Sequence, residues 1–150
     1  MSQTATYHTM VTWKGEHSGR LRMGNGPELD FSSPPDAKGL QGVLTPEDAF
    51  VAAVNTCIMM MFLWSCERLK INLQAYECIA VGTKLIELDH TEIFTQIRLT
   101  PEIRVRAGEE PSSSIKARIH RALQSAQKYS LVANSIKSEV IIEPVIEIIQ

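Results

Sequence analysis

The sequence feature that most constrains this chain is one long apolar run, which extends over residues 44–70. Thr45 is a favourable N-cap for a helix and Pro46 suits the first helical position. The acidic residues at 47 and 48 then lie where a carboxylate favours the positive end of a helix dipole. Asn55 and Thr56 are the only polar residues between positions 49 and 64. The run therefore predicts a helix that is apolar on all of its faces.

A helix of this kind has to be enclosed on every side. At 1.5 Å per residue, the segment from Pro46 to Leu69 is roughly 36 Å long, about the width of a small domain. One small monomer does not easily surround such a helix. We therefore expect a second copy of the chain to cover part of it, which predicts a homodimer.

Length and charge limit the class of protein. The chain has 150 residues, 44% of them apolar, which fits a single domain over residues 1–150. A net charge of −2 gives no reason to expect nucleic acid or a membrane surface as a partner. Residues 1–10 have no secretory pattern, and the apolar run is shorter than a membrane span, which favours a buried helix. Three cysteines without framework spacing indicate the reducing cytoplasm.

The segments before the long helix read as strands. Thr4–Trp13 has strand composition, and the stretches Arg20–Met23 and Glu28–Phe31 alternate between polar and apolar residues. Turn-forming residues separate them, which predicts a three-stranded antiparallel meander. The Pro- and Gly-rich stretch Ser32–Val43 predicts a loop, and a loop in this place often lines a site.

The segments after the long helix predict a hairpin, a helix and a strand. Ile71–Glu87 and Glu92–Thr100 form the hairpin, and its second strand is open to extension past Pro101 to Val105. Apolar residues recur at helical spacing from position 115 to 126, which predicts an amphipathic helix, and residues 131–136 suit a short helical turn. A last strand is expected over Ser138–Ile149, where Pro144 confines it to an edge or a bulge. This order predicts an α+β fold with the sheet on one side and the helices on the other.

Cys57 is the sharpest candidate for chemistry, although a cysteine in an apolar helix is usually a small packing residue. It lies beside Asn55 and Thr56, a polar break that suggests a cavity or water. It is too far along the helix for the dipole to activate it, so a reactive thiolate here needs a cation from elsewhere. Cys66 is about 180° around the helix and cannot share its pocket, and Cys78 is most simply a packing residue on a strand.

Glu47 is the second candidate. Its simplest role is that of a first-turn carboxylate on the helix dipole. It is roughly 15 Å from Cys57 along the helix, so the two cooperate only if Glu47 comes from the partner copy. The four histidines are scattered and no zinc or phosphate-binding motif occurs, which predicts neither a metal site nor a cofactor.

Two segments resemble the OsmC/Ohr family, the osmotically inducible and organic hydroperoxide resistance proteins. Residues 45–57, Thr-Pro-Glu-Asp-Ala-Phe-Val-Ala-Ala-Val-Asn-Thr-Cys, are similar to the family segment Asn-Pro-Glu-x-Leu-x-Ala-Ala-x-x-x-x-Cys. Residues 126–137 are similar to the segment that carries the family's second cysteine. The resemblance implies antiparallel sheets wrapped around a long central helix, a second amphipathic helix, and an intertwined homodimer.

The same resemblance implies roles for individual residues. Cys57 would be the peroxidatic thiolate that attacks an organic hydroperoxide. Glu47 would orient an arginine that keeps Cys57 ionised, and Arg20 fits that role best. Arg22 and Lys38 are the other basic residues to consider.

Ser130 stands where the family has its second cysteine, and Leu131 stands at the following proline. A hydroxyl cannot resolve a sulfenic acid into a disulfide. The favoured hypothesis is therefore a one-cysteine peroxidase that uses an external thiol reductant. The alternatives are a non-catalytic homodimer that binds a small apolar ligand, and a structural homodimer in which Cys57 only packs.

Overall fold

The computed structural model describes residues 2–150. The chain forms two compact units, and the boundary between them in the sequence lies between Phe50 and Val51. The first unit holds β1 (Thr9–Gly15), β2 (Ser18–Met23), β3 (Glu28–Ser32) and the 3-10 helix η1 (Pro35–Ala37). The long helix α1 (Pro46–Arg68) begins in the first unit and continues into the second. The second unit also holds β4 (Leu73–Ile86), β5 (Glu92–Arg106), α2 (Ser112–Tyr129), α3 (Leu131–Asn134), β6 (Glu139–Ile142) and β7 (Val145–Ile149).

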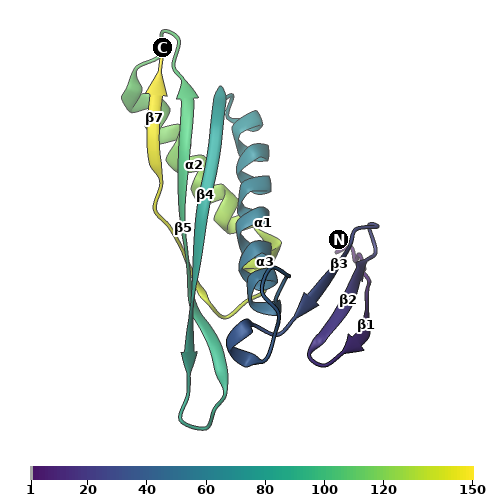
Figure 1. Cartoon of the computed structure of the whole chain (residues 1–150). Helices are drawn as coiled ribbons and strands as arrows, with labels where there is room; N and C mark the ends of the chain where they lie inside the picture. The colour runs from purple at the N-terminus through teal and green to yellow at the C-terminus, as the bar shows by residue number, and fades with distance from the viewer. Residues whose placement is uncertain (1) are drawn as a thin grey trace. The chain divides into compact units, whose positions relative to one another are not determined.

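In the first unit, three strands form an antiparallel sheet in the order β1-β2-β3 (Figure 1). This confirms the predicted meander, but its first strand begins at Thr9 and not at Thr4. Thr9 pairs with Met23, the last residue of β2, and the contact between the two segments ends where the N–H of Gly24 donates to the carbonyl of His8. Residues before Thr9 therefore have no β2 residue opposite them, and an unpaired segment does not form a strand.

In the second unit, β4 and β5 form the predicted hairpin, and β5 runs through Pro101 to Arg106. The final segment differs from the prediction. The expected single strand over Ser138–Ile149 is two strands, β6 and β7, and both pair with β5 in parallel. The sheet is therefore mixed, with β4 on one side of β5 and the two C-terminal strands on the other.

The break between β6 and β7 lies opposite Pro101 of β5. The N–H of Glu143 donates to the carbonyl of Leu99, and Pro101 is two residues further along on the same side of the strand. Pro101 has no N–H to offer there, and the pairing of β7 starts only at Glu102. Two prolines, Pro101 and Pro144, thus lie at the point where the ladder is interrupted.

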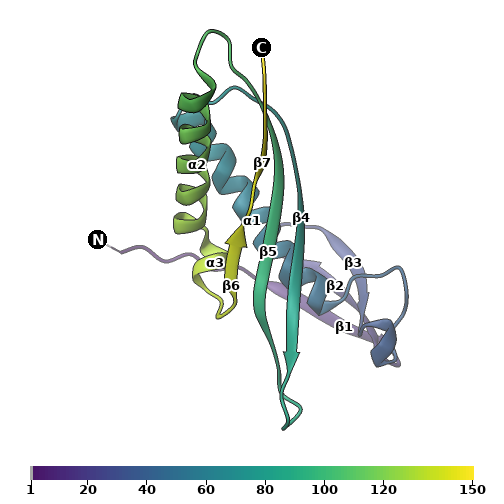
Figure 2. The same ribbon diagram turned by 90° about the vertical axis from the view of Figure 1, so that its left-hand side faces the viewer.

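Both long helices of the second unit lie on one face of its sheet (Figure 2). The main core forms between them and the sheet, and it contains Phe62 and Cys66 of α1, Ile103 and Val105 of β5, and the apolar face of α2. The predicted α+β arrangement, with helices on one side of a sheet, is confirmed. Gly82 of β4 lets α1 approach closely, because a Cβ there would be 2.7 Å from Val51 Cγ2.

The helix α1 begins where the sequence predicts. Thr45 Oγ1 accepts a hydrogen bond from the N–H of Asp48 at 3.1 Å, as an N-cap does. The buried positions of the helix are Val54, Ile58, Phe62, Ser65 and Cys66. In residues 2–150 this is the one helix long and apolar enough to cross a membrane, and the core helix of a soluble protein has the same composition. Its packing within the chain is one-sided.

Candidate active site around Cys57

Cys57 contacts Ser130, which is 73 residues further along the chain. Ser130 Oγ donates a hydrogen bond to Cys57 Sγ at 3.1 Å. Cys57 lies on α1 and is half-buried, whereas Ser130 lies between α2 and α3 and is fully buried. Position 57 carries the thiol, and position 130 is where the family resemblance places a second cysteine. The two positions are adjacent in the structure.

The local sequence explains the position of Ser130. The helix α2 ends at Tyr129, and Ser130 has extended backbone angles (φ −71°, ψ 114°), so the chain changes direction there. Ser130 Oγ then accepts a hydrogen bond from the N–H of Ala133 at 3.2 Å and caps α3. One hydroxyl thus starts a short helix and contacts the thiol on α1.

The junction between α2 and α3 is held by further hydrogen bonds. Asn134 Nδ2 donates to the carbonyl of Lys128 at 2.9 Å, and the N–H of Asn134 donates to the carbonyl of Ser130 at 3.0 Å. Gln127 Nε2 donates to the carbonyl of Val140 at 2.8 Å, which attaches α2 to β6. These contacts fix Ser130 on both sides.

The other two cysteines are in different environments. Burial, with a smaller effect of the Glu67 carboxylate, raises the pKa of the Cys66 thiol from 9.0 to about 12. Burial also raises the pKa of the Cys78 thiol. Because the thiolate is the nucleophile, burial lowers the reactivity of both thiols near neutral pH.

The polar pair next to Cys57 has a structural role. Asn55 Nδ2 donates to the carbonyl of Cys78 at 3.1 Å and so attaches α1 to β4. Thr56 is exposed, and its Oγ1 donates to the carbonyl of Ala52 at 2.7 Å. Of the two residues expected to meet a cavity or water, Thr56 is exposed, whereas Asn55 is half-buried and bonded to the neighbouring strand.

The basic candidates and Glu47 all belong to the first unit. Glu47 is in the first turn of α1, and within residues 2–50 it makes no ion pair. Arg20 Nη1 lies 3.1 Å from Asp30 Oδ1, and Lys14 Nζ lies 3.2 Å from the same oxygen. These hydrogen bonds, that of Lys14 first and that of Arg20 second, lower the pKa of the Asp30 carboxyl.

Arg22 Nη2 is 3.7 Å from Met10 Sδ on the neighbouring strand, and Lys38 follows η1 in a left-handed conformation (φ 68°). Cys57 belongs to the second unit, so pairing of any of these groups with the thiol stays a prediction.

Exposed apolar side chains lie on the Cys57 face of α1 and next to Ser130 in the sequence. Trp64 is 67% exposed and Met60 is 44% exposed. At about 100° per residue they lie about 20° and 60° from Cys57 around the helix. Tyr129 and Leu131, which flank Ser130, are 59% and 67% exposed. Sequence reasoning missed these four residues, although the helical spacing from Cys57 gave a usable signal for Met60 and Trp64.

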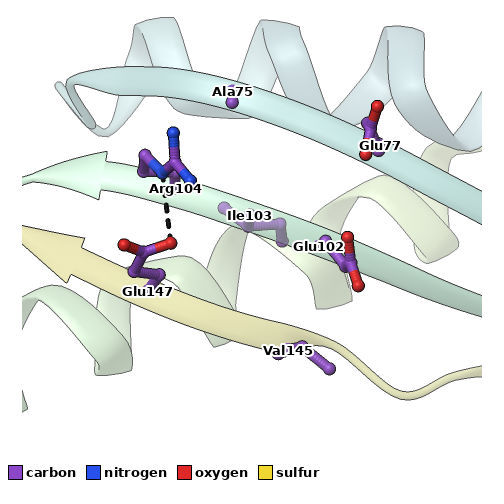
Figure 3. Close-up of a pocket in the computed structure, with 7 residues that line it drawn as sticks. All are labelled: Ala75, Glu77, Glu102, Ile103, Arg104, Val145 and Glu147. Carbon is purple, nitrogen blue, oxygen red and sulfur yellow. Dashed lines mark hydrogen bonds and ion pairs between the residues drawn. The ribbon is translucent and has the colours of Figure 1, made fainter.

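A groove of about 460 Å³ lies elsewhere in the second unit (Figure 3). Its charged lining comprises Glu77 and Glu102, which are direct cross-strand partners, and Arg104, which pairs with Glu147 at 3.1 Å. The neighbouring Tyr76 packs against Phe62 of α1, so Glu77 points to the opposite face of the sheet. Among residues 2–150 no group of three or more His, Cys, Asp or Glu residues is placed to hold a metal ion.

Comparisons with solved structures find the same fold. An OsmC-like protein of unknown function from Vibrio cholerae has a TM-score of 0.84 and 21% sequence identity, and the match covers 95% of this chain and all of that one. An organic hydroperoxide resistance protein from Elizabethkingia anophelis has a TM-score of 0.71 and 15% identity, with 98% of this chain and 99% of that one covered. For the corresponding protein from Bacillus subtilis the TM-score is 0.61 and the identity 15%, with 95% and 98% covered.

No curated protein sequence matches the chain at a significant level. The family model described as OsmC-like protein matches residues 39–145, which include α1, the hairpin, α2 and the Cys57–Ser130 contact. This match extends over well more than half of the sequence. The chain therefore belongs to the OsmC-like protein family.

Proposed function

We propose that this protein reduces organic hydroperoxides with Cys57 as its single reactive cysteine, and that an external thiol completes the cycle. The observation that carries the proposal is the hydrogen bond from the buried Ser130 hydroxyl to Cys57 Sγ at 3.1 Å. The other two thiols are less suited to this role, because burial raises their pKa values.

The proposed reaction has two stages. The Cys57 thiolate attacks one oxygen of the O–O bond, the bond breaks, and the alkoxide leaves and takes up a proton to become an alcohol. The sulfur is oxidised by two electrons to a sulfenic acid. An external thiol then displaces water to form a mixed disulfide, and a second thiol, or the other thiol of a dithiol, releases Cys57 and leaves the reductant as a disulfide.

The surroundings of Cys57 favour an organic substrate over hydrogen peroxide. Met60, Trp64, Tyr129 and Leu131 present apolar surface on the elements that carry Cys57 and Ser130. Contact between such surface and an alkyl or aryl substituent is favourable because it removes both from water. The structural neighbours from Elizabethkingia anophelis and Bacillus subtilis are named as organic hydroperoxide resistance proteins, which agrees with this substrate class.

The proposal includes a second copy of the chain and a cation. The exposed apolar residues of α1 support a homodimer, in which Glu47 of one copy orients a basic residue, Arg20 first, toward Cys57 of the other. The ion pair of Arg20 with Asp30 is exposed and therefore weak, so Arg20 is free to exchange partners at little cost. Three free cysteines suit the reducing cytoplasm, which also supplies the thiol reductant.

The test is the consumption of cumene hydroperoxide in the presence of a dithiol. We expect the protein and its Cys66→Ala/Cys78→Ala variant to consume the peroxide, and Cys57→Ser to lose more than about 99% of the rate because the proposed reaction takes place on the Cys57 sulfur alone. A folded wild-type protein that leaves the peroxide intact would overturn the proposal. Recovery of a small apolar molecule from the native protein would then support the ligand-binding alternative.

A further inference from the structure

The Ser130 hydroxyl is a buried donor with a restricted choice of acceptors. A serine hydroxyl has one hydrogen to donate and two lone pairs to accept with. In the part of the chain that the structure describes, one lone pair is used by the N–H of Ala133, and the hydrogen is directed to Cys57 Sγ. Ser130 is fully buried, so water does not offer another acceptor.

The two protonation states of Cys57 accept this hydrogen unequally. A neutral thiol sulfur is a weak acceptor. A thiolate carries a full negative charge, and hydrogen bonds to ionised acceptors are roughly twice as strong as neutral ones. The Ser130–Cys57 contact therefore favours the charged form of the thiol, which is the form that attacks a peroxide.

The Ser130 oxygen is held in place by the N–H of Ala133, and the backbone around it is held as well. The N–H of Asn134 donates to the Ser130 carbonyl, and Asn134 Nδ2 reaches back to Lys128. A donor held in place before the reaction stabilises charge without reorganisation, which is the requirement for electrostatic activation.

We propose that Ser130 is a positioning residue that stabilises the Cys57 thiolate by hydrogen-bond donation and leaves the oxidised cysteine to an external thiol. The part of this inference that concerns the external thiol rests on the proposed function. A serine at this point has two effects. It supplies the donor, and, because a hydroxyl does not displace the oxygen of a sulfenic acid, it does not close an internal disulfide.

The first experiment measures alkylation of Cys57 by iodoacetamide between pH 5 and 10, in a Cys66→Ala/Cys78→Ala background and without peroxide. We expect Ser130→Ala to reduce the rate at pH 7 roughly tenfold, the loss of one hydrogen bond to a charged group, and to move the midpoint of the profile to higher pH. Ser135→Ala is the matched control, because Ser135 follows the last residue of the same short helix and its hydroxyl donates to the Leu131 carbonyl, not to Cys57. It should leave the profile unchanged.

A Ser130→Ala profile that coincides with that of the parent protein would overturn the proposal. If Ser130→Ala fails to fold, Ser130→Cys takes its place. Diamide should then form a disulfide between the introduced thiol and Cys57, with loss of two hydrogens in the intact mass. Two sulfurs that stay reduced in the folded variant would show that the contact does not exist and would equally overturn the proposal.

Failure of the proposed function gives a different result. Neither alkylation nor diamide oxidation requires a hydroperoxide, so both report on Ser130 alone. A wild-type protein that consumes no cumene hydroperoxide, but whose alkylation profile still depends on Ser130, would overturn the peroxidase and keep the positioning role. Rapid peroxide consumption that is equal in Ser130→Ala would overturn the positioning role and keep the peroxidase.

Discussion

The three thiols of this chain are in three different environments. Cys66 is part of the main core, and Cys78 lies on β4, where its carbonyl accepts a hydrogen bond from Asn55. Cys57 is half-buried and accepts a hydrogen bond from Ser130. A sequence pattern identifies Cys57 by its distance from Glu47, but it cannot show which hydroxyl, amide or strand will surround each sulfur.

Cys66 provides a prediction about alkaline stability. Its pKa is raised from 9.0 to about 12, so the folded state holds the thiol proton over a pH range where the unfolded state releases it. Below pH 9 the thiol is protonated in both states and the full free energy of unfolding is present. As the pH rises from 9 toward 12, ionisation of the thiol favours the unfolded state and the free energy of unfolding falls. Urea unfolding of Cys66→Ala should show a smaller decrease in the free energy of unfolding between pH 8 and pH 10.5 than wild type. A parallel decrease in both proteins would show that Cys66 does not make this contribution.

At the scale of elements, the position of α1 depends on its cap and on β4. Thr45 caps it as the sequence predicts, and Asn55 and Gly82 set its approach to the strand. The cap is predictable because the capping oxygen and its N–H are three residues apart. Contacts with β4 join residues far apart in the sequence, so the apolar pattern predicted the helix but did not show which side of it packs.

Gly82 provides a test of that approach. A methyl group in Gly82→Ala would lie 2.7 Å from Val51 Cγ2 and 2.9 Å from a ring carbon of Phe94, so these side chains or the backbone that carries them would have to shift. We expect a loss of about 1–3 kcal/mol in the free energy of unfolding, which chemical denaturation measures. Thr83→Ala, at the exposed neighbouring position, should change it by less than about 0.5 kcal/mol. An unchanged free energy of unfolding in Gly82→Ala would mean that the space between Gly82 and Val51 can hold a methyl group.

The final strand shows where sequence reasoning reaches its limit. The composition of Ser138–Ile149 predicts strand structure, and Pro144 predicts an interruption, but the parallel pairing with β5 has no local signal. Similarly, the buried position of Ser130 follows from the meeting of α1 with the α2–α3 junction. The family resemblance indicated Ser130, but only the three-dimensional structure shows that its hydroxyl contacts Cys57 Sγ.

For the whole molecule, the main observation is the amount of apolar side-chain surface that the chain leaves uncovered. In the second unit this surface includes Met60 and Trp64 of α1 and Ile79 and Val81 of β4. Large exposed apolar side chains on neighbouring elements are typical of an association surface. The sequence predicts a helix that is apolar on all faces, and within the chain α1 packs on one side only. A second copy that covers the other side therefore remains our proposal.

The prediction at this scale concerns self-association. Trp64→Glu should shift the protein toward monomer in sedimentation velocity at micromolar concentration, because it places a charge within an apolar contact. Lys116→Glu, an exposed charge reversal on α2, should leave the sedimentation coefficient unchanged. A wild-type protein that sediments as a monomer at every concentration would contradict the homodimer.

The parallel pairing of β6 and β7 with β5 also has a consequence during protein synthesis. Both strands are made after every other element of the sheet, and each joins a partner about 43 residues earlier in the chain. Until they emerge, a nascent chain presents β5 with one unpaired edge beside Ile103 and Val105. Open edges next to apolar residues are sites of aggregation. The edge of β5 beside Ile103 and Val105 therefore stays open until residues 139–149 can pair with it.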